Sequence, residues 1–126
     1  KYFTILLSKL VERGVRMNQQ VSSQMLKGIL MGCILIILSK KELYGYKISE
    51  ELQKFGFDSI PKGTIYPLLM NMDKKGLIVG EMRASDEGPQ RKYYHLTENG
   101  LNEKESFIKQ WVFLSGNVEK LLKENN

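Results

Sequence analysis

The fold is decided by the stretch KGTIYPLLMNMDKKGLI at residues 62–78. Its apolar residues recur at the three- and four-residue spacing of a helix that buries one face: Ile65, Leu68, Leu69 and Met72. Two lysines and then Gly76 follow, which is typical of a helix end. Residues 77–83 read as a strand, 84–90 as a turn-rich loop and 91–96 as a second strand. The stretch therefore predicts a helix that is followed at once by a β-hairpin.

Two further helices are expected before this stretch and one after it. Residues 25–38 are apolar at helical spacing and at most other positions, with Ser22 or Ser23 as the N-cap, so this helix is either central or at a subunit interface. A second short helix opens at Tyr44-Gly45-Tyr46, and Thr97 caps a long last helix. This order predicts a mainly α fold with a small β-hairpin, namely a winged helix-turn-helix plus a long C-terminal dimerisation helix.

The chain divides into three expected parts. These are an N-terminal extension at 1–21, a winged-helix DNA-binding domain at 22–97 and a dimerisation helix at 98–126. Codons for Glu12-Arg13-Gly14 can form a purine run like a bacterial ribosome-binding site shortly before Met17. On one hypothesis Met17 is the true start, and residues 1–16 are translated leader. The alternative is a native N-terminal helix, which the apolar spacing within residues 2–10 favours.

Composition and charge limit the function classes. The chain has 126 residues, enough for one domain, and a formal net charge of +5. From Met17 onward, however, 15 basic residues oppose 13 acidic ones, so a nucleic-acid argument depends on where the charges lie. Cys33 and His95 are the single cysteine and the single histidine, which argues against a disulfide and a metal site, and we expect no cofactor. Cys33 is expected to pack inertly on its apolar helix.

Membrane proteins and enzymes are disfavoured by what the sequence lacks. The longest apolar run, residues 28–38, is too short to cross a bilayer, and no signal-peptide cleavage site follows the apolar start of the chain. We see no nucleophile–base pair, no glycine-rich phosphate loop and no pair of carboxylates at a catalytic spacing. A cytoplasmic protein without enzymatic activity is therefore expected.

The charges around the helix of residues 62–74 favour contact with DNA. Its outward face should carry Thr64, Pro67, Asn71 and Lys74, and Lys62 stands at its N-terminus, where backbone N–H groups also favour phosphate. The hairpin, or wing, adds three cations, which are Arg83, Arg91 and Lys92. It also carries two acids in its loop, which leaves open a second hypothesis, a protein-interaction module without sequence-specific DNA binding.

The two quoted motifs, with GPQRKYYHLTENG at 88–100 and LYGYKI at 43–48, resemble the PadR family of bacterial transcriptional regulators. The resemblance covers about residues 22–123 and includes Gly-Thr-Ile-Tyr-Pro, Gly-Leu-Ile, Lys-Tyr-Tyr and Leu-Thr-x-x-Gly. The single C-terminal helix is similar to that of the small subfamily. The resemblance implies a homodimer on a two-fold symmetric duplex and repression that a ligand relieves. Its candidate DNA contacts are Lys62, Gly63, Thr64, Tyr66, Pro67, Asn71, Lys74, Arg91 and Lys92.

Two departures from the family pattern remove basic residues. In the wing, Pro89-Gln90 leaves only two consecutive basic residues, Arg91 and Lys92. On the helix of residues 62–74, Asn71 stands where the family usually has a basic residue. Each lost phosphate contact lowers the salt dependence of binding. We therefore expect modest affinity for non-specific DNA.

A heptad seam on the last helix predicts the subunit interface. Its members, spaced four and three residues apart, are joined by two residues of the first helix, and the expected interface is Leu30, Ile34, Phe107, Trp111, Leu114, Val118 and Leu121. The resemblance implies that two copies of Trp111 line a flat pocket between the subunits for planar aromatic effectors. We expect Met31 and Leu35 to form apolar walls of this pocket, and the neutral Ser115, one turn after Trp111, disfavours cationic ligands. In the alternative reading, Trp111 is only the largest interface residue.

Overall fold

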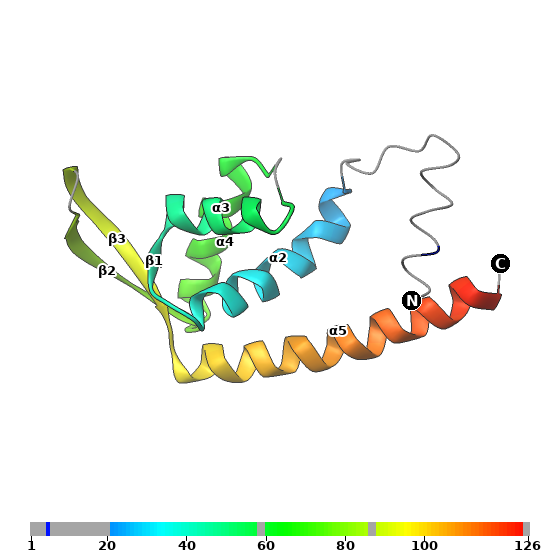
Figure 1. Ribbon diagram of the computed structural model, residues 1–126. Helices are drawn as coiled ribbons and strands as arrows, with labels where there is room; N and C mark the ends of the chain where they lie inside the picture. The colour runs from blue at the N-terminus through cyan, green and yellow to red at the C-terminus, as the bar shows by residue number, and fades with distance from the viewer. Residues whose placement is uncertain (1–4, 6–20, 58–59, 86–87, 125–126) are drawn as a thin grey trace.

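The computed structural model describes Ile5 and residues 21–57, 60–85 and 88–124. The N-terminal extension expected at 1–21, and with it the choice between leader and native helix, lies outside these residues except at Ile5 and Val21. Helices and strands follow in the order α2, β1, α3, α4, β2, β3, α5 (Figure 1). This is the predicted winged helix-turn-helix with a long final helix. Among the residues described, no helix has both the length and the apolarity needed to cross a membrane.

Three helices build the body of the domain. They are α2 at Ser23–Leu38, α3 at Gly45–Lys54 and α4 at Lys62–Lys74. Ser22 is the N-cap of α2, as predicted, because its hydroxyl accepts a hydrogen bond from the backbone N–H of Met25 at 3.2 Å. The helices bury one continuous apolar core, to which the sheet adds Ile78 and Tyr94. The core residues of the helices are Leu30, Ile34, Leu35, Leu38, Ile48, Leu52, Ile65, Leu69 and Met72.

The sheet has three strands where the sequence predicted two. Strands β2 at Ile78–Ser85 and β3 at Gly88–Leu96 form the hairpin, and the two-residue strand β1 at Leu43–Tyr44 pairs with the other side of β3. All pairs are antiparallel. The helix predicted to open at Tyr44-Gly45-Tyr46 is confirmed as α3, with Tyr44 as its N-cap. The sequence did not predict that Tyr44 also pairs with Tyr93 in the sheet.

The strands of the hairpin are also longer than predicted. Residues 84–90 were expected to form a loop because they are rich in glycine, proline and polar side chains. Instead Ser85 pairs with Gly88, and the Ser85 hydroxyl donates a hydrogen bond to the Pro89 carbonyl at 2.9 Å, so pairing continues nearly to the tip. β2 and β3 project away from the helices as a narrow arm (Figure 1).

The last helix, α5 at Glu98–Glu124, has 27 residues and extends far beyond the rest of the fold (Figure 1). Thr97 caps it as predicted, since its hydroxyl accepts a hydrogen bond from the Gly100 N–H at 3.0 Å. Close to its start, α5 packs on α2 at a point where the Phe107 ring covers Gly32 so tightly that a side chain at Gly32 would collide with it. The two helices are thus joined within one protomer.

This packing corrects part of the predicted subunit interface. Leu30 and Ile34, expected to contact a partner, are 0% exposed inside the protomer, and so is Leu35, which was expected to wall the ligand pocket. Phe107 is half-buried against α2 of its own chain. An all-round apolar helix can be covered either by its own chain or by a second copy, and here the chain itself covers these residues.

Candidate nucleic-acid interface

Helix α4 has one buried face and one free face. Ile65, Leu69 and Met72 are fixed in the core, which sets the rotation of the helix about its axis. The opposite face is exposed, as predicted, and carries Gly63, Thr64, Tyr66, Pro67, Asn71 and Lys74. Lys62 is the first residue of the helix. The fold therefore presents one side of α4, with a rigid orientation, to whatever approaches it.

Sequence reasoning missed Met70 on this face. Its side chain is 65% exposed, one turn after Tyr66 and one turn before Lys74. Apolar residues of a helix are assigned to the core by default, and only the phase set by Leu69 and Met72 places Met70 outside. Exposed apolar groups beside Asn71 give this face a mixed character, suited to the methyl group of thymine as well as to polar base edges.

Tyr66 is held in place by a glycine of the neighbouring helix. Its ring lies over Gly45, where an added Cβ would stand 2.6 Å from a ring carbon of Tyr66. The residue nevertheless remains 44% exposed. Gly45 of the Tyr-Gly-Tyr motif thus leaves room for the Tyr66 ring. Tyr66 has a structural role in packing on Gly45, and it keeps an exposed surface available for contact.

The cations Arg91 and Lys92 leave opposite sides of the hairpin. They are consecutive residues of β3, so their side chains alternate. The Arg91 guanidinium stacks on Tyr44, 4.6 Å from the ring centroid. The Lys92 ammonium lies 5.9 Å from the centroid of Tyr94, and its aliphatic stem covers Gly80. Each cation is thus supported by a tyrosine while its charge remains on the surface of the hairpin.

Tyr93 and Tyr94 show the same alternation. Tyr94 is buried in the core, and burial raises the pKa of its hydroxyl, with Asp73 and Tyr66 adding to the effect. Tyr93 points to the outer face, where it meets Tyr44 edge to face at a centroid distance of 5.3 Å. Tyr94 therefore belongs to the core, and Tyr93 lies on the opposite side of the strand.

Arg83, the third cation of the hairpin, is occupied by two carboxylates. Its Nη2 donates to Glu42 Oε2 at 2.7 Å, and its Nε donates to Glu81 Oε1 at 2.8 Å. The hydrogen bond from Arg83 holds the pKa of the Glu42 carboxyl below its ordinary value, and the two carboxylates raise the pKa of Arg83. His95 Nδ1 lies 3.7 Å from the same Glu42 oxygen and makes no hydrogen bond.

The free part of α5 carries an apolar surface. Trp111, Leu114, Val118 and Leu121 of the seam are each between 51% and 64% exposed. The seam prediction did not include Val112 and Phe113, which are equally exposed on other sides of the helix. A contiguous apolar stripe of this length is unusual on the surface of a monomer. We call the four seam residues the α5 stripe.

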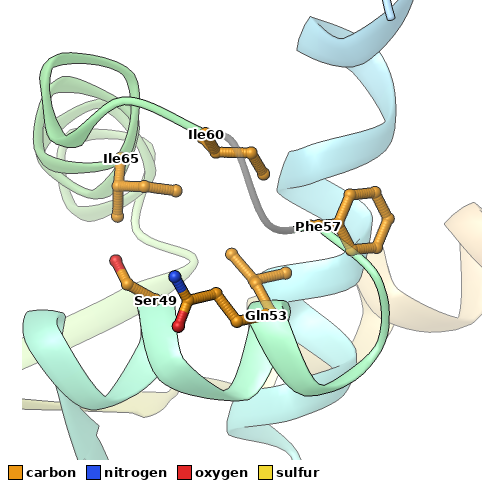
Figure 2. A pocket seen from close by; sticks show the side chains of 6 residues that line it. Ser49, Gln53, Phe57, Ile60 and Ile65 are labelled. Carbon is orange, nitrogen blue, oxygen red and sulfur yellow. The ribbon is translucent and has the colours of Figure 1, made fainter. Parts of the chain in front are cut away.

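The remaining residues of the expected ligand pocket are not enclosed in one protomer. Met31 on α2 and Ser115 on α5 are half-buried. A small cavity does exist elsewhere, between α3 and α4, lined by Ser49, Leu52, Gln53, Phe57, Ile60 and Ile65 (Figure 2). Its volume of about 20 Å³ is room for about one water molecule, far below that of a ligand pocket.

Comparisons with known proteins agree with this architecture. The sequence family described as the transcriptional regulator PadR-like family matches residues 34–106. A crystal structure of a PadR-like transcriptional regulator from Bacillus cereus is 52% identical, covers 79% of this chain and 97% of its own, and superimposes with a TM-score of 0.72.

Two further structures have the same fold. A Streptococcus transcriptional regulator is 45% identical, with a TM-score of 0.73, and the match covers 79% of this chain and 98% of that one. A PadR family transcription regulator from Clostridium difficile is 31% identical, with a TM-score of 0.67, over 73% of this chain and 96% of that one.

Proposed function

Because this chain belongs to the PadR-like family of transcriptional regulators, we propose that it is a dimeric repressor that binds a two-fold symmetric DNA operator. In this proposal α4 enters the major groove, and the hairpin of β2 and β3 contacts the neighbouring backbone or groove. Residues 22–97 serve as the DNA-binding domain and 98–126 as the dimerisation helix. The chain acts by binding and has no enzymatic activity.

The observation that carries the proposal is the free face of α4. A helix locked by Ile65, Leu69 and Met72 presents small, polar and apolar groups outward, with Lys74 in its last turn. The helix begins at a second basic residue, Lys62. Asn71 can bond an adenine edge in two places, and the exposed methyl groups of Thr64 and Met70 suit thymine. Arg91 and Lys92 on the hairpin supply phosphate contacts that set the register.

Dimerisation is supported by the α5 stripe. The long helix continues past the body of the protomer, and half-exposed apolar side chains follow it there. Pairing with a second copy removes this surface from water, which is the main driving force for protein association. A dimer then fixes the distance between the two α4 helices at about one helical turn of DNA, roughly 34–36 Å, or a multiple of it.

An effector site between the subunits follows from the same arrangement. Two copies of Trp111 offer flat, half-exposed indole surfaces, and Met31 and Ser115 are partly accessible beside α5. No acidic residue follows Trp111 until Glu119, so a planar ligand without a strong positive charge suits the site best, since a buried unpaired cation is costly. A ligand that changes the angle between subunits would alter operator affinity through its preference for one dimer shape.

The test is a fluorescence anisotropy titration with the duplex upstream of the chain's own gene. We expect Thr64→Ala to weaken operator binding more than binding to random DNA, and Arg91→Gln to weaken both together and to flatten the salt dependence. Lys54→Gln is the matched control, because Lys54 is an exposed lysine of α3 that pairs with Glu51 at 2.8 Å. Absence of binding to any duplex would instead favour the protein-interaction module, a hypothesis supported by the acidic partners of Arg83.

A further inference from the structure

The hairpin carries two arginines directly opposite one another. Arg83 of β2 and Arg91 of β3 are register partners, so their side chains leave the same face of the hairpin. DNA that approaches this face of the hairpin meets both arginines at the same level along the strands. Like charges in this cross-strand arrangement repel each other, so the pair needs compensation.

Within the described part of the chain, acidic side chains compensate the charge of Arg83 but not that of Arg91. Arg83 is held at 2.7 Å by Glu42 and at 2.8 Å by Glu81, and its guanidinium lies 5.4 Å from the centroid of Tyr93. By contrast, among the residues that the structure describes, no carboxylate forms an ion pair with Arg91. The contact that the described residues give Arg91 is with the Tyr44 ring.

Glu42 differs from Glu81 in where it comes from. Glu81 is two residues from Arg83 on the same strand, a local contact. Glu42 lies 41 residues away, between α2 and β1, so its bond connects the helical body to the hairpin. It takes the Nη2 edge of the guanidinium, which would otherwise be available for a bidentate bond to phosphate.

We propose that Glu42 is a positioning residue that keeps Arg83 out of DNA binding, so that Arg91 alone serves this face of the hairpin. The inference rests on the proposed function of DNA binding. Arg83 with Glu42 and Glu81 carries a net negative charge, so no phosphate is attracted to it unless a carboxylate is displaced. Its contribution to counterion release on DNA, and hence to non-specific affinity, is suppressed.

The experiment measures the slope of log K against log salt for a 20-base-pair duplex, by fluorescence anisotropy. The variants are wild type, Glu42→Gln, Arg83→Gln and the double variant, with Arg91→Gln as a reference for one lost contact. Each released arginine steepens the slope by about 0.9, or about 1.8 for two subunits. We expect Glu42→Gln to steepen the slope by this amount when Arg83 is present and to change it much less in the Arg83→Gln background.

Two controls separate this effect from others. Glu50→Gln removes the same charge from an acid that pairs with Lys47 at 3.0 Å on α3, and it should leave the slope unchanged. Glu81→Gln frees the Nε edge of Arg83 and should act in the same direction as Glu42→Gln. Far-ultraviolet circular dichroism confirms that each variant is folded.

The outcomes are distinct. An equal effect of Glu42→Gln with and without Arg83, or no effect at all while wild type binds DNA, overturns the role of Glu42. A wild-type protein that binds no duplex overturns the proposed function and this inference with it.

Discussion

Replacing Thr97 by valine tests how the end of α4 is joined to the start of α5. The Thr97 hydroxyl accepts a hydrogen bond from Gly100 N–H at 3.0 Å in the first turn of α5. It donates to the carbonyl of Gly76 at 2.6 Å, just after α4 ends, and lies 3.1 Å from the carbonyl of Leu77. Valine keeps the shape of the side chain and removes all of these bonds.

The expected loss follows from these contacts. Loss of an N-cap costs about 1 kcal/mol of the free energy of unfolding. Leaving a part-buried carbonyl without its partner adds about 1 kcal/mol. The total of about 2 kcal/mol corresponds to a fall in Tm on the order of 8 °C for a chain of this size.

Urea unfolding followed by circular dichroism measures this change. Protein concentration is held constant, because association shifts apparent stability. Thr64→Val is the matched control, since the Thr64 side chain is exposed on α4 and its variant should stay within about 0.5 kcal/mol of wild type. Equal unfolding free energies for the Thr97 and Thr64 variants would refute the reasoning that one hydroxyl joins the two helices.

Four further outcomes are expected. Asn71→Ala should cost about 1–3 kcal/mol of operator affinity and abolish discrimination at one adenine position, and an unchanged base preference in anisotropy titrations would contradict this. Leu114→Asp should give monomers at micromolar concentration in light scattering, whereas Asn102→Asp, at an exposed position of α5 outside the α5 stripe, should stay dimeric; a dimeric Leu114 variant would argue against the seam. Burial raises the pKa of the Cys33 thiol, so the fraction of thiolate at pH 8 is low. The reaction of Cys33 with a thiol-specific label should therefore be slower in the folded protein than in the urea-unfolded protein. Neutral planar dyes should quench the fluorescence of Trp111, the single tryptophan, more than cationic dyes do, and quenching by cationic dyes alone would reverse the charge argument.

Features set by neighbouring residues could be predicted from the sequence. Ser22 and Thr97 were identified as caps because capping depends on a side chain and an N–H two or three residues away. The free face of α4 followed from the spacing of its buried residues. The exposure of Thr64 and Asn71 needed no knowledge of the rest of the fold.

Features that depend on distant parts of the chain could not be predicted. Two residues, Leu43 and Tyr44, are too few to show an alternating pattern, so β1 appears only when β3 lies beside it. The sequence likewise does not reveal that Glu42 binds Arg83, 41 residues away. The burial of Ile34 inside the protomer could not be separated from burial at an interface, because both require the same apolar residues.

Because the Tyr66 ring packs directly on Gly45, the residues at positions 45 and 66 depend on each other. A Cβ at position 45 would stand 2.6 Å from a ring carbon of Tyr66, so a larger residue there must displace the ring from its present position. The effects of the two single substitutions on the free energy of unfolding should therefore not add up to the effect of the double substitution. A combinatorial library at positions 45 and 66 should therefore return correlated pairs of residues.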